Sequence, residues 1–136
     1  MAAIVGPHRH RALGTWRQTV HFPAAGGKQA FSFKSIIAFT SEGIVHQTVQ
    51  PAIESALGVW EPNGDDSFNA TFIIFRHDDP ANPGVNRVRI RYTLAEHGER
   101  FTGTATVESF DNVDEQGAPP KRFPTADGVR MKVLLQ

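Results

Sequence analysis

A chain of 136 residues is the size of a single domain whose core needs no disulfide or metal to be stable. Its 14 Lys and Arg residues balance its 14 Asp and Glu residues, so no net charge attracts a nucleic acid or an anionic membrane over long range. The absence of cysteine excludes disulfides and thiolate nucleophiles, and residues 1–5 are too short an apolar stretch for a signal peptide or a membrane-spanning helix. We expect a soluble, cytoplasmic protein that binds neither nucleic acid nor membranes.

Apolar residues recur at every second position, and Gly, Pro, Asn and Asp interrupt them at short intervals, which is typical of an antiparallel all-β domain. A polar, flexible tail is expected over residues 1–11, and a single domain over residues 12–136. Residues 52–57 are predicted to form a connecting turn or one helical turn, and residues 111–128 a long loop. The predicted strands cover residues 15–22, 31–40, 44–50, 58–62, 68–76, 87–95, 101–110 and 130–135.

About eight consecutive strands would leave two unpaired edges in an open sheet, and closure into a barrel removes both edges. We therefore predict a closed, antiparallel, up-and-down β-barrel, which at this strand number can just enclose one small ligand. The alternative is a curved sheet of the α+β class. It requires amphipathic helices near the N-terminus, and residues 1–30 show no helical apolar period.

Two predicted strands, 31–40 and 68–76, are apolar on both faces. In the strand 68–76, Phe72 and Ile74 lie on one face, and Ile73 and Phe75 lie on the other. One face can line the barrel interior, whereas the other needs a cover or stays exposed. A homodimer is one prediction for that outer face, and a surface loop or ordinary exposure are the alternatives.

The pentapeptide Ala-Leu-Gly-x-Trp occurs at residues 12–16 and again at residues 56–60, and it contains both tryptophans of the chain. We expect each glycine to permit a tight turn before a strand, and each indole to fill one end of the barrel. We attribute the repeat to this same local requirement, a glycine turn followed by a strand with an indole, at both positions. Ancestral duplication is the alternative. Trp16 is predicted to be structural, and Trp60 is a candidate ligand contact.

Gly14, Thr15 and Trp16, at the start of the first strand, resemble the opening Gly-x-Trp signature of lipocalins and the wider calycin group. The resemblance implies that Trp16 closes the base of the barrel. It also implies that an arginine of the last strand packs across the indole, and Arg130 opens the last predicted strand. Residues 13–133 are similar to small bacterial lipocalin-like proteins without an assigned activity, through the stretches 58–61, 65–72 and 101–104.

The usual signatures of metal and cofactor chemistry are missing. His8 and His10 form an H-x-H pair, but in the predicted solvated tail, and residues 77–79 offer three adjacent ligands without a partner elsewhere. Haem-binding calycins use a late histidine, and none follows His97 here. Neither a G-x-S-x-G elbow nor a phosphate-binding loop is present. We therefore expect no metal and no cofactor.

The strand 87–95 has two faces of opposite character. One carries Tyr92 among aliphatic residues, and the other carries Arg87, Arg89 and Arg91. If the apolar face points inward, the Tyr92 hydroxyl reaches the lumen and the arginines are solvated. If the arginines point inward, they form an anion trap for a carboxylate ligand.

We predict that the barrel binds a small, largely apolar or aromatic molecule. The alternative is a cofactor-free isomerase, cyclase or lyase, with His46 as acid or base, Tyr92 as hydrogen-bond donor and Arg89 stabilising negative charge. A third reading is a structural or interaction role with an empty lumen. The predicted ligand contacts are Phe33, Phe39, Trp60, Phe72, Ile74, Ile90, Tyr92 and Ala105, and the predicted barrel base is Gly14, Trp16 and Arg130.

Overall fold

The computed structural model describes residues 6–50, 54–75, 84–111, 114 and 120–134. The regular structure of the described chain is β-strand apart from two single-turn 3-10 helices, η1 (Pro7–Arg9) and η2 (Glu96–Gly98). The strands are β1 (Gly14–Phe22), β2 (Phe31–Phe39), β3 (Ile44–Val49), β4 (Glu54–Pro62), β5 (Ser67–Phe75), β6 (Val85–Ala95), β7 (Arg100–Phe110), β8 (Lys121–Arg122) and β9 (Thr125–Arg130).

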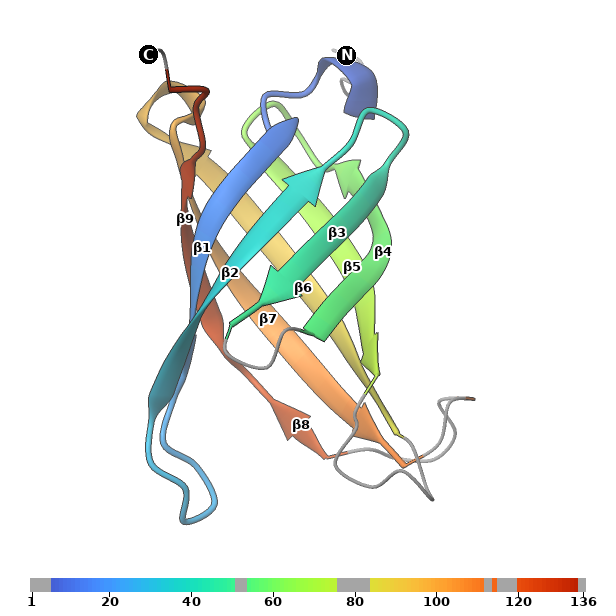
Figure 1. Ribbon diagram of the computed structural model, residues 1–136, viewed down its shortest axis with the longest axis vertical. Coiled ribbons are helices and arrows are strands. Elements are labelled where there is room, and N and C mark those ends of the chain that lie inside the picture. Colours follow the sequence, from blue (N-terminus) through green and yellow to red (C-terminus); the bar gives the residue numbers. More distant parts are fainter. Residues whose placement is uncertain (1–5, 51–53, 76–83, 112–113, 115–119, 135–136) are drawn as a thin grey trace.

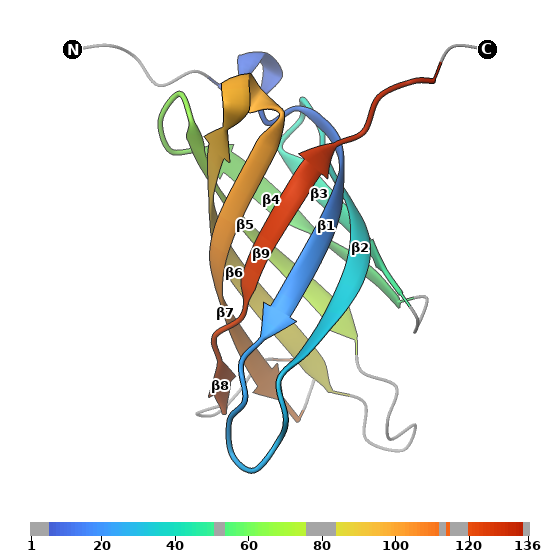
Figure 2. The ribbon, with the colours of Figure 1, turned by 90° about the vertical axis from the view of Figure 1, so that its left-hand side faces the viewer.

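Antiparallel pairing runs from each strand to the next as far as β8, and β9 pairs with both β7 and β1, so the sheet closes on itself (Figures 1 and 2). The two-residue strand β8 pairs with one part of the edge of β7, and β9 pairs with another part of the same edge. Pro124, which has no N–H, lies between them, and its carbonyl accepts a 3.0 Å hydrogen bond from the Ala105 amide. The predicted closed, up-and-down barrel of eight strands is therefore confirmed.

None of the helices in the described residues is long and apolar enough to cross a membrane.

Two strands differ from the prediction by more than two residues at a boundary, β4 and β9. β4 begins at Glu54, so residues 54–57 are strand rather than turn, because β3 pairs with them as far as Glu54. β9 covers Thr125–Arg130, so Arg130 ends the last strand instead of opening it. The sequence Ala-Asp-Gly in β9 is typical of a turn, but Gly128 is required there because the Phe101 ring lies 2.3 Å from where its Cβ would be.

In the segment before β1, His10 packs onto one end of the barrel, which corrects the prediction that this histidine is solvated, whereas Arg9 and Arg11 are exposed. His10 is only 3% exposed. Its Nδ1 accepts a 3.0 Å hydrogen bond from the Ala12 amide, and its Nε2 lies 2.8 Å from the Gly64 carbonyl oxygen. The ring also makes edge contacts with Trp60 and Phe68. Residues 1–5 lie outside the described residues.

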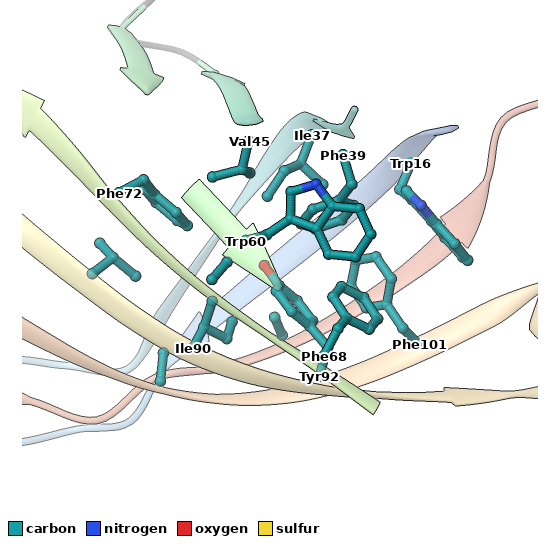
Figure 3. Packing of buried hydrophobic residues seen from close by; sticks show 14 of the residues in the cluster. Trp16, Ile37, Phe39, Val45, Trp60, Phe68, Phe72, Ile90, Tyr92 and Phe101 are labelled. Carbon is teal, nitrogen blue, oxygen red and sulfur yellow. The ribbon is translucent and has the colours of Figure 1, made fainter. Parts of the chain in front are cut away.

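Aromatic side chains fill the interior at this same end, which we call the packed end (Figure 3). The Tyr92 ring stacks on Phe68 with their centroids 4.8 Å apart, and it meets Phe101 edge-on at 4.7 Å. Burying each large ring contributes about 2–3 kcal/mol to folding. The six rings of the packed end are Trp16, Phe39, Trp60, Phe68, Tyr92 and Phe101, none more than 4% exposed.

Arg130 closes the base of the barrel across Trp16. Its Cζ lies 4.3 Å from the centre of the indole, and its guanidinium donates hydrogen bonds to the carbonyls of Arg11, Leu13 and Gly98. The guanidinium thus joins the chain before β1, the loop before β7 and the end of β9. Gly14, with φ +124°, lets the chain turn beside it.

The outer face of the barrel carries exposed apolar residues on several strands. Leu57 and Val59 on β4 are 61% and 59% exposed, and Phe75 on β5 is 53% exposed. Ile36 on β2 is also exposed, as expected for the outer face of a strand that is apolar on both sides. The homodimer stays a prediction for this face.

Candidate ligand-binding site

The half of the barrel away from the packed end contains a cavity of about 200 Å³. Its walls come from the inward residues of β1, β2, β3, β5, β6, β7 and β9. Phe22 and Phe31, at the ends of β1 and β2 that face the β1–β2 hairpin, are part of the lining. Because Phe31 is 45% exposed, the cavity reaches the surface there, and we call this end the mouth.

Six of the eight predicted ligand contacts line this cavity. The other two, Phe39 and Trp60, do not, because both rings are committed to the packed end. Trp60 Nε1 donates a 2.9 Å hydrogen bond to the Thr40 carbonyl, which fixes the indole in the closure. The six that line the cavity are Phe33, Phe72, Ile74, Ile90, Tyr92 and Ala105.

A buried hydrogen-bond network forms the floor of the cavity. Gln18 is 2% exposed, and its Nε2 donates to Ser35 Oγ and to Gln47 Oε1, both at 2.9 Å. Tyr92 in turn donates a 2.9 Å hydrogen bond to Gln18 Oε1. The sequence prediction named Tyr92 but missed both glutamines. The available signal was their alternation with apolar residues, since each occupies an inward position of its strand.

Tyr92 is a neutral hydrogen-bond donor at this floor. The side chain is fully buried, and burial raises the pKa of its phenol well above the usual value. No described residue places a positive charge beside the hydroxyl to oppose this shift. The group can therefore orient a ligand or hold Gln18 in place, but it does not exchange a proton near neutral pH.

Two polar groups of the lining have unused hydrogen-bonding capacity. Asn86 Oδ1 is buried and accepts no hydrogen bond. Gln47 accepts through Oε1, while its Nε2 donates to none of the described residues. Buried polar groups are nearly always satisfied, so Asn86 Oδ1 is an exception. The lining therefore contains one acceptor and one donor that no described residue satisfies.

The three predicted catalytic residues do not meet. Tyr92 lies inside the barrel, whereas His46 and Arg89 are on its outer face and exposed. On β6 the apolar residues face inward and the arginines outward, so the interior contains no arginine from this strand. This arrangement forms no acid–base site with these three residues.

Two of the three arginines of β6 instead pair with one carboxylate. Glu108, on β7, is an outward residue that is only 5% exposed, and Arg87 and Arg89 lie 3.1 and 3.0 Å from its Oε1. Burial acts to raise the pKa of this carboxyl. The hydrogen bond from Arg87 and the charges of Arg87, Arg89 and Lys121 outweigh it, so the pKa lies below its usual value.

A second polar chain crosses the outer surface of β2, β1 and β9. His21 Nδ1 lies 2.8 Å from Ser32 Oγ, and its Nε2 lies 2.7 Å from Asp127 Oδ2. These residue types occur in hydrolytic triads, where the carboxylate is buried. Here the His21 and Asp127 side chains are 45% and 58% exposed, so these hydrogen bonds link neighbouring strands at the surface.

Potential metal ligands are scattered in the described residues, which contain no group of three acidic or histidine side chains able to hold an ion. His10 uses both ring nitrogens in hydrogen bonds. The side chain of His8 and residues 77–79 lie outside what the structure describes.

These features define a class: an eight-stranded antiparallel β-barrel, closed by aromatic rings at one end and hollow at the other. No protein-family model matches the chain, and no curated protein matches its sequence.

Proposed function

We propose that this protein binds one small, largely apolar molecule inside a lipocalin-like barrel. The observation that carries the proposal is the cavity itself, which combines apolar walls with a buried acceptor on Asn86 and a free donor on Gln47. The Arg130–Trp16 closure next to Gly14 supports the lipocalin-like part of the proposal.

The volume limits the size of the ligand. An apolar cavity of about 150 Å³ is sufficient for benzene. The present 200 Å³ therefore suits a molecule of one or two rings, or a short alkyl chain, rather than a long fatty acid. The walls of phenylalanine and branched aliphatic residues favour such a body by dispersion and by burial of apolar area.

The polar groups would orient the ligand. A hydroxyl or N–H group would satisfy Asn86 Oδ1, and an oxygen acceptor would bond to Gln47 Nε2. Each such bond contributes about 1 kcal/mol, because it replaces a bond to water. The apolar body would therefore supply most of the affinity, and the amides would supply selectivity.

Calorimetric titration with 2-naphthylmethanol, a neutral two-ring alcohol, tests this function. Binding is expected for the native protein and is expected to be lost in Ala105→Leu, which fills the cavity from β7. Thr104→Leu is the matched control, since it adds a similar side chain one residue away on the exposed outer face. Ala126→Val, also in the lining, is a second filling variant if Ala105→Leu is unstable.

Native and denaturing mass spectra of protein purified from its own source give an independent measurement. A mass excess that disappears on denaturation would identify the size of a resident molecule. The proposal is overturned if the native protein binds no probe and has no excess mass, or if Ala105→Leu and Thr104→Leu bind the alcohol equally well.

A further inference from the structure

Arg122 lies at the mouth of the cavity and stacks on two of its lining rings. Its Cζ is 4.2 Å from the centre of Phe22 and 5.2 Å from the centre of Phe31, and these rings stack on each other at 4.8 Å. β8 pairs Arg122 with Val107, an inward residue of the lining, so the arginine is on the lumen side of its strand. The position therefore belongs to the entrance of the site.

The stacking involves the face of the guanidinium and does not use its edge. A guanidinium has five N–H donors in its plane, arranged to match the two oxygens of a carboxylate. In the described part of the chain, no carboxylate or carbonyl accepts a hydrogen bond from Arg122. Arg87 and Arg89, by contrast, share Glu108, and Arg130 bonds to three carbonyls.

The cavity behind Arg122 has no charged residue in its lining. Its polar groups are neutral, and the Tyr92 phenol stays protonated. A charged group placed deep inside would lose its hydration without a compensating ion, which is costly. A ligand that carries a charge must therefore keep it at the mouth, where the guanidinium lies half-buried.

We infer that the ligand is a small carboxylate with an apolar body of one or two rings. The body fills the cavity, and the carboxylate accepts a two-pronged hydrogen bond from the edge of Arg122. This inference rests on the proposed function and adds the chemical class of the ligand. Stacking on Phe22 and Phe31 orients the guanidinium before the ligand arrives, which lowers the entropy lost on binding.

The test compares 2-naphthoate with 2-naphthylmethanol, two probes that share a body and differ in the charged group. Calorimetry on the native protein should give an affinity about tenfold higher for the carboxylate, as expected for one partly solvated charge-assisted pair. In Arg122→Gln the two affinities should agree within about twofold, with the alcohol unaffected. Arg122→Lys should keep part of the preference, because an ammonium lacks the planar fork.

Arg91→Gln is the matched control, since it removes the same charge from an exposed site on the outer face of β6. It should leave the preference unchanged. If Arg122→Gln is unstable, an increase of ionic strength from about 0.01 M to about 1 M should selectively weaken naphthoate binding to the native protein.

The outcomes separate the two proposals. If neither probe binds the native protein, both the cavity function and this inference are overturned. If both probes bind equally, or if Arg122→Gln keeps the full preference for naphthoate, the carboxylate class is wrong while the cavity function stands.

Discussion

A Cβ atom added at Gly58 would lie 2.0 Å from the carbonyl oxygen of Thr71, on the neighbouring strand β5. Gly58 therefore allows β4 and β5 to approach each other. Gly14, the equivalent glycine of the repeated pentapeptide, instead has a φ of +124° and allows a turn. The repeated pentapeptide thus requires glycine for close strand packing at one position and for a positive φ at the other.

We expect Gly58→Ala to cost more than about 4 kcal/mol in the free energy of unfolding, because the strands must separate to admit the methyl group. Gly14→Ala should cost about 1–3 kcal/mol, from backbone strain. Gly26→Ala should cost about 1–2 kcal/mol or less, since Gly26 has a positive φ but open space around it. Denaturant unfolding measures all three. A native-like midpoint for Gly58→Ala would contradict the close approach.

Arg130→Met should destabilise the protein by about 2–3 kcal/mol. The variant loses the contact with the Trp16 ring and leaves carbonyls of Leu13 and Gly98 without a donor. Arg130→Lys should recover less than half of the loss, because an ammonium cannot cover the indole and reach several carbonyls together. Arg91→Met, on the exposed face of β6, is the control and should change stability by less than about 0.5 kcal/mol. Equal thermal midpoints for Arg130→Met and Arg91→Met would show that the contacts of Arg130 at the barrel base do not stabilise the fold.

Glu108 should make stability depend on acid pH. Its folded pKa is lowered, so its stabilising effect is present above the unfolded value of about 4.3 and is lost as the pH falls through the folded pKa. The thermal midpoint of Glu108→Gln should therefore lie below that of the native protein at neutral pH, and the gap should narrow on acidification. Glu96→Gln removes an exposed partner of Arg100 and should show almost no gap at any pH. If the difference in thermal midpoint between the native protein and Glu108→Gln widened in acid, the lowered pKa of Glu108 would be refuted.

Tyr92 is the only tyrosine of the chain, so its ionisation can be followed directly by ultraviolet absorbance. Burial raises its folded pKa, so the folded protein should show no tyrosinate at about pH 10, where the unfolded chain titrates. The corresponding stabilisation is complete below about pH 10 and is lost as the pH rises above it. Tyrosinate should therefore appear together with unfolding. A smooth titration near the usual value, with native circular dichroism, would show that water reaches the hydroxyl.

Alternation along the strands was enough to predict the closed barrel and six residues of the cavity lining, whereas both orientations of the strand that became β6 stayed open. The period of two depends only on local sequence, and burial of one face enforces it. His10 was missed because its burial depends on Gly64, which is 54 residues away in the sequence. Arg122 was missed for a related reason. Only its pairing with Val107 separates it from an ordinary loop residue in a proline-rich segment.

The two glutamines of the cavity floor, Gln18 and Gln47, show a different limit of prediction from sequence. Each replaces an apolar residue at an inward position, so the sequence contained the signal that the lumen is partly polar. Which atoms bond to each other depends on the barrel bringing β1, β2, β3 and β6 together across the interior. No local pattern specifies that convergence.

The barrel begins with β1 and ends with β9 at the packed end, opposite the mouth (Figures 1 and 2). A fluorophore, an affinity tag or a solid support attached through either flank would therefore leave the entrance facing solution. Both flanks also meet the part of the molecule that Arg130 ties together, so a load applied there acts on this cross-linked region. Should the cavity bind a ligand as proposed, the protein could therefore be immobilised through either flank without blocking the mouth.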